Sequence, residues 1–95
     1  MDDNTKGLRE LRERIDSIDT QIVELLGERF RLALPIARAK HAQGIDIHDQ
    51  DRENEVILRL DRYGEACGVP PGVVPCVYEL IFDFMKDYQK SPGND

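Results

Sequence analysis

The sequence is poor in the residues from which metal sites, disulfide frameworks and stacked aromatic surfaces are built. Among its 95 residues there is no tryptophan, and there are only two histidines and two cysteines. His41 and His48 have no partner at ligand spacing, so we expect no metal site. Cys67 and Cys76 are too few for a disulfide framework, so we expect free thiols that are buried as small hydrophobes.

Positive charge is also scarce. Thirteen Lys and Arg stand against nineteen Asp and Glu, which gives a formal net charge of −6. Without a basic surplus, neither nucleic acid nor an anionic membrane surface is an expected partner. No apolar run approaches a membrane span, and the acidic N-terminus MDDNTKG lacks the apolar region of a secretion signal. We expect a cytoplasmic protein with a single domain over residues 1–95, made of a core at 7–90 and a disordered tail at 91–95.

One long amphipathic stretch, from Leu8 to Ala42, dominates what the sequence does contain. Its apolar residues recur at every third or fourth position, the spacing that keeps one face of a helix buried. This line, here called the seam, consists of Leu8, Leu11, Ile15, Ile18, Ile22, Leu25, Arg29, Leu32, Ile36 and Ala39. Nine of the ten are apolar, and the exception is Arg29. A guanidinium in such a line needs an anion or several acceptors, so Arg29 predicts a bound anion.

Two further cations extend this prediction. Lys40 lies eleven residues after Arg29, so on one helix the two side chains point within roughly 20° of each other, about 16 Å apart along the axis. That gap fits a small polyanion. Arg12 lies seventeen residues before Arg29, about 25 Å away, and can reach the gap only from an antiparallel second copy. A helix of about 52 Å also overshoots a compact chain of this length, whose radius of gyration is about 13 Å, so we predict a homodimer.

The first helix is expected from about Gly7 to His41, after frayed residues 1–6. Pro35 lies inside this helix, where it removes one backbone hydrogen bond and crowds the preceding turn. We therefore predict a kink at residues 31–35, with a break into two helices as the alternative.

Two shorter helices follow, and no strand pattern is present. Asp49 is the expected N-cap of the second helix, and a turn rich in Gly and Pro at residues 68–72 separates it from a third helix at about 71–90. The inner side of the second helix is predicted to consist of Glu53, Val56, Ile57, Leu60, Tyr63 and Cys67. The third helix shows core spacing at Val74, Val77, Ile81, Phe84 and Tyr88, beside a second line of Tyr78, Phe82, Met85 and Gln89. The predicted fold class is all-α, a three-helix chain.

Four short motifs occur in a specific order: LRERIDSID at 11–19, ER at 28–29, IARAK at 36–40 and DQDRE at 49–53. Together they closely resemble the all-helical chorismate mutases, over residues 7–90 and without a large insertion or deletion. The resemblance implies that two chains intertwine as a six-helix homodimer with two identical active sites, each lined by both subunits. It also implies the Claisen rearrangement of chorismate to prephenate, which needs no metal and no cofactor.

The same resemblance assigns roles at the two charged ends of the substrate and at its ether oxygen. Arg29 and, from the other subunit, Arg12 would bind the two carboxylates. Lys40 and Gln89 would address the ether oxygen, on which partial negative charge builds as the carbon–oxygen bond breaks. A fixed cation and a hydrogen-bond donor at that oxygen are what this reaction needs.

At the ring hydroxyl, the resemblance places Glu53 together with Lys40 and the region of Asp49. Arg52, beside Glu53, would complete a cationic wall. Met85 stands where members of the family often carry a small hydroxyl residue, so the pocket becomes more apolar or loses a polar contact with the substrate.

The departures at Met85 and Pro35 leave alternatives open. The chain could be a related mutase or a pyruvate lyase that acts on isochorismate or 4-amino-4-deoxychorismate. Glu53 favours a mutase, because the lyase branch of this fold generally lacks that carboxylate, but a 4-amino substrate would suit Glu53 equally well. The non-enzymatic alternative is a helical dimerisation module whose charges only decorate its surface.

Overall fold

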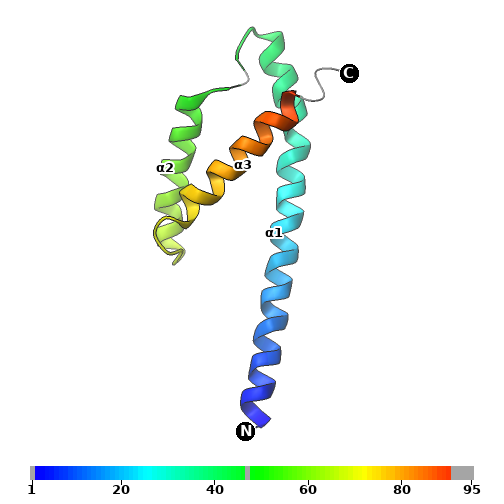
Figure 1. The fold of residues 1–95 in the computed structure, drawn as a ribbon, viewed down its shortest axis with the longest axis vertical. Coiled ribbons are helices and arrows are strands. Elements are labelled where there is room, and N and C mark those ends of the chain that lie inside the picture. The colour runs from blue at the N-terminus through cyan, green and yellow to red at the C-terminus, as the bar shows by residue number, and fades with distance from the viewer. Residues whose placement is uncertain (1, 47, 91–95) are drawn as a thin grey trace. The chain divides into compact units, whose positions relative to one another are not determined.

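The computed structural model describes residues 2–46 and 48–90, and it describes side chains from residue 7 onward. It contains three helices, α1 (Asp2–Ala42), α2 (Gln50–Ala66) and α3 (Val73–Lys90), and no strand within the described ranges (Figure 1). The predicted all-α class and the three-helix chain are therefore confirmed. The disordered tail expected at 91–95 lies outside the described residues, and the single domain and the six-helix homodimer stay predictions.

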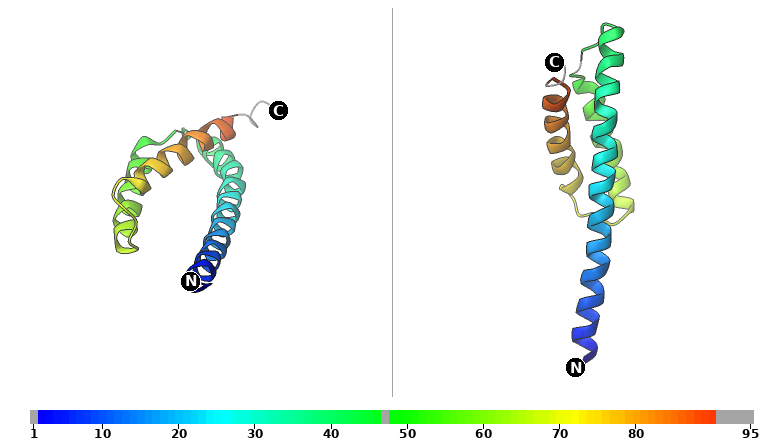
Figure 2. Two further views of the ribbon diagram at one scale, coloured as in Figure 1. Left: turned by 60° about the horizontal axis from the view of Figure 1, so that its bottom comes forward. Right: turned by 90° about the vertical axis from the view of Figure 1, so that its right-hand side faces the viewer.

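Helix α1 is one continuous α-helix that contains Pro35 (Figure 2). The alternative of a break into two helices at this proline is wrong, whereas the kink stays a prediction. The helix also begins at Asp2, five residues before the predicted start at Gly7, so the prediction of frayed residues 1–6 is wrong for residues 2–6.

By its internal contacts the chain forms two compact units, Met1–Leu32 and Ala33–Asp95. The described part of the first unit consists of α1 residues, and its apolar seam faces solvent in the single chain. Side chains of the seam that are exposed here are Leu8, Leu11, Ile15, Ile18, Ile22, Leu25 and Leu32. The burial predicted for these residues is therefore not provided by the chain itself. Exposed apolar stripes of this size commonly mark a surface that another molecule covers.

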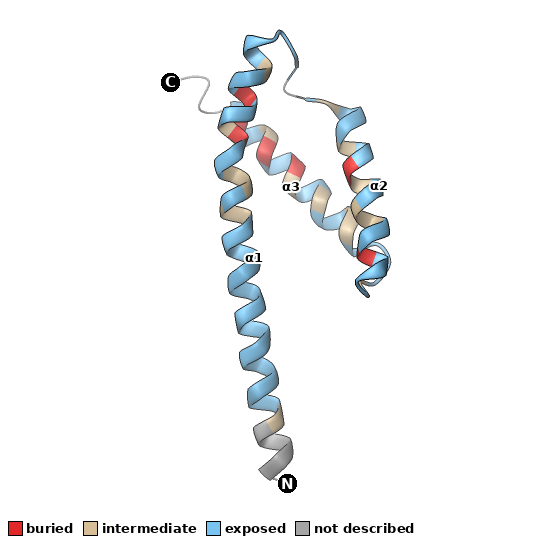
Figure 3. Cartoon of the chain, turned by 180° about the vertical axis from the view of Figure 1, so that it is seen from behind, coloured by how far each residue is buried: buried red, intermediate tan, exposed pale blue. Residues whose placement is uncertain are grey.

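The second unit contains the last ten residues of α1 together with α2 and α3, and it holds the buried apolar residues of the described chain (Figure 3). These residues are Ala33 and Ala37 on α1, Val56 on α2, and Phe82 and Met85 on α3. The α2–α3 pair is packed closely near its turn, where a Cβ on the buried Gly64 would lie 2.8 Å from Cγ2 of Val74. Gly68 and Gly72 adopt φ values of +86° and +88° in that turn, a conformation that glycine adopts without steric cost.

The N-terminus of α2 is capped as predicted. The Asp49 side chain accepts a hydrogen bond from the backbone N–H of Arg52 at 3.0 Å. Asp51 and Glu53 lie in the first turn, where carboxylates stabilise the helix dipole. This cap fixes where α2 begins and thereby where the Glu53 side chain projects.

Three sequence predictions about burial are wrong for the single chain. The buried line of α3 is Phe82, Met85 and Gln89, whereas Phe84 of the predicted core line is 64% exposed. The two lines are adjacent on the helix, so spacing alone does not show which of them packs inward. Cys67 and Cys76 are free thiols as predicted, but they are exposed rather than buried, because each lies next to the α2–α3 turn. Tyr63, predicted on the inner side of α2, is exposed as well.

Helix α3 begins at Val73 rather than at Pro71. Gly72 adopts a positive φ at the end of the turn, so Pro71 and Gly72 belong to the turn rather than to the helix. Within the described ranges, every helix is either too short or too polar to cross a lipid bilayer.

Candidate active site

The side-chain amide of Gln89 is held in the interior of the second unit. Gln89 is the one buried polar residue among those described, and its Nε2 donates a hydrogen bond to the backbone carbonyl of Ala33 at 2.9 Å. The bond joins the last turn of α3 to α1 across 56 residues of sequence. A buried amide with a fixed partner has a fixed rotamer, so its remaining N–H and its Oε1 have defined directions.

Lys40 continues the face of α1 to which Gln89 is bonded. It lies seven residues after Ala33, which is about two helical turns and about 10 Å, on the same side of the helix within roughly 20°. Ala33 and Ala37 on this face are buried, and Lys40 is half-buried.

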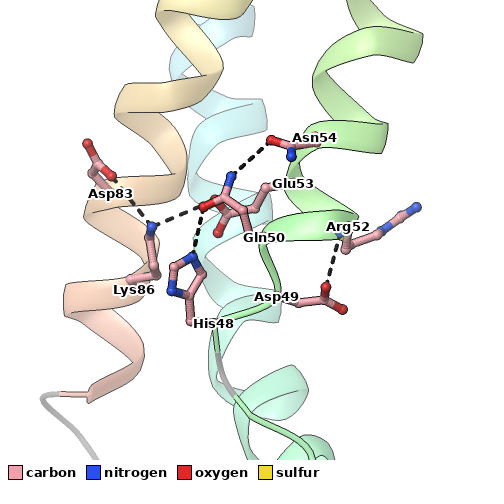
Figure 4. A network of polar contacts seen from close by, with 8 residues as sticks. All are labelled: His48, Asp49, Gln50, Arg52, Glu53, Asn54, Asp83 and Lys86. Atoms are coloured by element: carbon pink, nitrogen blue, oxygen red, sulfur yellow. Dashed lines mark hydrogen bonds and ion pairs between the residues drawn. The ribbon is translucent and has the colours of Figure 1, made fainter.

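Glu53 projects from the first turn of α2 toward α3, where it forms an ion pair that the sequence analysis missed. Oε1 of Glu53 lies 3.7 Å from Nζ of Lys86, and the two side chains are only 16% and 23% exposed (Figure 4). Nζ of Lys86 also lies 3.7 Å from Oδ1 of Asp83, whose side chain is 72% exposed. Glu53 is therefore a partly buried carboxylate with one neighbouring ammonium group.

The pairing of Glu53 with Lys86 had a detectable signal in the sequence. Glu53 lies 17 residues before Pro70 and Lys86 lies 16 residues after it. Two helices that reverse direction at a turn bring residues at equal distances from that turn to the same level. Lys86 is also the residue after Met85, which belongs to the line of α3 that ends in Gln89. A cation opposite the Glu53 carboxylate was therefore predictable once the turn had been located.

Asp49 and Arg52 precede Glu53 in the sequence, but their side chains bind other groups than Glu53 and Lys86. Oδ1 of Asp49 caps α2. The guanidinium of Arg52 pairs with Glu55 at 3.2 Å on the exposed side of α2, and in Figure 4 it extends away from the pair of Glu53 and Lys86. The single chain therefore brings the Asp49 backbone region next to Glu53, but it does not bring the Arg52 cation there.

The remaining predicted site residues differ in their surroundings. Met85 is buried in the second unit, in the same line as Gln89, so this position contributes an apolar side chain to the interior.

In the first unit, Arg29 is half-buried and Arg12 is exposed. Arg12 borders an open hollow of about 360 Å³ that is lined by Leu8, Arg9, Arg12, Glu13 and Asp16. All of these residues belong to α1, and one helix cannot enclose a ligand.

Comparison with known proteins decides the family. The sequence matches the family described as chorismate mutase type II over residues 11–90. The chain belongs to the chorismate mutase type II family. All the predicted site residues, from Arg12 to Gln89, lie inside the matched region, and the resemblance identified from the four motifs is confirmed. The predicted enzyme class, an isomerase of the chorismate mutase type, is confirmed with it.

Several curated relatives of the family are similar to the chain. The chorismate mutase of Methanocaldococcus jannaschii is 31% identical over 83 residues, which cover 87% of this chain and 84% of the relative. The bifunctional chorismate mutase/prephenate dehydratase of Aquifex aeolicus is 45% identical over 86 residues, covering 87% of this chain but 24% of the relative. The bifunctional enzyme of Escherichia coli is 32% identical over 73 residues, covering 77% and 19%. The chain thus spans most of the first relative and a quarter or less of the two bifunctional ones.

Proposed function

We propose that the chain catalyses the Claisen rearrangement of chorismate to prephenate, in aromatic amino acid biosynthesis, as a cytoplasmic homodimer that needs no metal or cofactor. The observation that carries the chemistry is the buried Gln89 amide, fixed against α1 at 2.9 Å from the Ala33 carbonyl. The same unit of the chain holds Lys40 and the partly buried Glu53 carboxylate. A donor, a cation and a carboxylate on one compact unit fit the ether oxygen and the ring hydroxyl of chorismate.

The proposed mechanism is electrostatic. In this pericyclic step one carbon–oxygen bond breaks while one carbon–carbon bond forms, and negative charge develops on the departing ether oxygen. A primary amide has two N–H groups; in Gln89 one is used by Ala33, and the other can donate to the ether oxygen. Lys40 places a positive charge at the same atom. Because the bond to Ala33 fixes the amide before substrate arrives, no reorganisation of this donor is needed during the reaction.

Orientation of the substrate is the second contribution. The flexible enolpyruvyl arm of chorismate must lie over the ring before the new carbon–carbon bond can form. We propose that Arg29 and Arg12 of the partner subunit bind the two carboxylates, which fixes both ends of the molecule, while Glu53 accepts a hydrogen bond from the ring hydroxyl. Fixing a reactive conformation in this way can supply several kcal/mol, about 7 or more in favourable intramolecular cases.

A second copy of the chain is part of the proposal for two reasons. The apolar seam of the first unit is exposed in the single chain, and the hollow beside Arg12 is open because only α1 lines it. A second chain that covers the seam would bury this apolar surface and supply the missing wall. The direction of stabilisation is clear, since each square ångström of apolar surface removed from water contributes about 25 cal/mol.

The substrate is tested first. Purified protein is offered chorismate, isochorismate and 4-amino-4-deoxychorismate separately, and the product of each is identified; prephenate from chorismate is the expected result.

Subunit mixing then tests the shared active site. Arg12→Ala and Arg29→Ala are each expected to be inactive. After the two variants exchange subunits, half of the dimers are heterodimers and one of their two sites is intact, so activity recovers to about a quarter of the wild-type value.

A matched control distinguishes an active site shared between subunits from a nonspecific recovery of activity on mixing. Arg29 and Gln89 are proposed to come from the same chain, so a mixture of Arg29→Ala with Gln89→Ala generates no intact site and stays inactive. Absence of recovery in the Arg12/Arg29 mixture, with subunit exchange verified by mass spectrometry of the intact dimers, contradicts the shared site. Turnover of isochorismate or the 4-amino compound in place of chorismate would move the function to one of those alternatives.

A further inference from the structure

Lys86 lies beside Glu53 of the predicted site, but neither the motifs nor the proposed mechanism uses it. Its ammonium lies 3.7 Å from Oε1 of Glu53, and both side chains are largely shielded from solvent. The other carboxylate near it, Asp83, is 72% exposed and lies on the outer side of α3 (Figure 4). Glu53 is thus already paired with a cation of its own chain before any substrate binds.

We propose that Lys86 is a positioning residue that tunes substrate choice: by pairing with Glu53 it weakens the attraction of this carboxylate for an ammonium group on the substrate ring and so shifts the preference of the site toward a neutral hydroxyl. The inference rests on the proposed function, because it assumes that Glu53 meets the ring substituent. It also narrows the ambiguity that Glu53 leaves by itself, since an unpaired carboxylate would accept a hydroxyl and would attract an ammonium group even more strongly.

A charged substrate amine would be a second cation beside the Glu53 carboxylate. With Lys86 on one side of the Glu53 carboxylate, the second oxygen can accept one hydrogen bond from a hydroxyl at no electrostatic cost. A protonated amine in the same place would bring a second positive charge to within about 7 Å of the Lys86 ammonium, two contact distances apart across one carboxylate. The repulsion is only partly screened, because the side chains of Glu53 and Lys86 are 16% and 23% exposed. Asp83 compensates little, since its charge is well solvated.

The test compares two substrates on charge variants of one residue. Lys86→Met removes the charge and keeps the length of the side chain, Lys86→Gln removes it with a polar group, and Lys86→Arg keeps it. For each protein, kcat/KM is measured for chorismate and for 4-amino-4-deoxychorismate, at slightly acidic pH where a primary amine is protonated. Where the amine is not turned over, its inhibition constant against chorismate replaces kcat/KM.

We expect both neutral variants to shift the preference toward the amine by about tenfold relative to wild type, the effect of removing one like charge at that distance in a partly screened site. Lys86→Arg should keep the wild-type preference. Asp83→Asn, which alters the exposed partner of Lys86, is the matched control and should leave the preference unchanged. A purely structural role for Lys86 would lower turnover of both substrates together without changing their ratio.

The outcomes distinguish this inference from the proposed function. If wild-type protein converts chorismate and the ratio in both neutral variants equals the wild-type ratio, Lys86 does not tune substrate choice and the proposed function stands. If the ratio changes equally in Lys86→Arg, the shape of the side chain rather than its charge is responsible, which also overturns the inference. If wild-type protein converts neither compound, both proposals fail.

Discussion

Replacing Gln89 by glutamate tests the geometry at the centre of the proposed site. The substitution exchanges Nε2 for an oxygen, and that oxygen would face the Ala33 carbonyl across the 2.9 Å now spanned by a hydrogen bond. Two acceptors at this distance are tolerated only if the new carboxyl keeps its proton and donates it. Position 89 also lies one residue before the end of α3, where the negative end of the helix dipole disfavours a carboxylate. Both effects raise the pKa of the introduced carboxyl in the folded protein.

The sign of the stability change follows from this direction. Below the pKa of glutamate in the unfolded chain, about 4.3, the carboxyl is protonated in both states and can donate to Ala33, so Gln89→Glu should be nearly as stable as wild type. As the pH rises through the higher pKa of the folded state, the folded protein loses the stabilisation that the protonated form provides. The free energy of unfolding of the variant should therefore fall between acidic and neutral pH.

The magnitude can be bounded with a second variant. Gln89→Met loses the hydrogen bond but buries no charge, and the Ala33 carbonyl keeps its place in the backbone hydrogen bonds of α1, so we expect a cost of about 0.5–1.5 kcal/mol at every pH. For ionised Gln89→Glu, the desolvation of a buried charge adds at least about 1–3 kcal/mol. At neutral pH Gln89→Glu should be less stable than Gln89→Met by that second amount, whereas at acidic pH Gln89→Glu should be the more stable of the two by about 0.5–1.5 kcal/mol, because it keeps the hydrogen bond to Ala33.

Urea denaturation of both variants and wild type, repeated from about pH 4 to pH 8, measures these differences, and kcat/KM for chorismate over the same range tests the catalytic role. Gln89→Met should lose about 100-fold in kcat/KM at all pH values, the usual effect of removing one donor to a developing oxyanion. Gln89→Glu should be most active where its carboxyl is protonated. A pH-independent stability of Gln89→Glu would show that residue 89 is not held against Ala33. Near-normal activity of Gln89→Met would remove the amide from the mechanism.

Two further predictions concern α2. Asp49→Ala should lower the free energy of unfolding by about 1 kcal/mol through loss of the cap on the Arg52 N–H, whereas Asp49→Asn, which keeps the cap, should be close to wild type; equal stability of the two variants in urea denaturation would contradict the capping role. Gly64→Ala should destabilise by about 1–3 kcal/mol, because the new methyl group would lie 2.8 Å from the stiff Val74 side chain. Gly7→Ala is the control, since its methyl group meets nothing within 4 Å, and a destabilisation as large as that of Gly64→Ala would refute the packing explanation.

The helices and their ends were predictable because their signals are local. The cap at Asp49 and the turn glycines at Gly68 and Gly72 act within a few residues of where they occur in the sequence, so their effects can be inferred without the fold. The start of α1 at Asp2 was missed because the apolar pattern begins only at Leu8.

The contacts of the site were less predictable because they depend on how helices cross. The family resemblance predicts roles for Gln89 and Glu53, but it did not predict that Gln89 would be bonded to the Ala33 carbonyl or that Glu53 would pair with Lys86. Both partners lie on other helices, and their choice depends on which of two adjacent lines of α3 faces inward. Hydrophobic spacing favoured the line of Phe84, whereas the structure buries that of Phe82. An isolated pattern cannot decide between neighbouring lines that are both largely apolar.

The bond between Gln89 and Ala33 has a consequence for the order in which the protein folds. The α2–α3 hairpin joins segments that are close in sequence and can form early, whereas this bond closes a loop of 56 residues, and long-range contacts of this kind are slow to form. During refolding we expect helical circular dichroism to return before catalytic turnover does. The amide proposed to hold the ether oxygen would then be among the last groups to reach its place, so enzymatic activity would report completed folding more faithfully than helix content does.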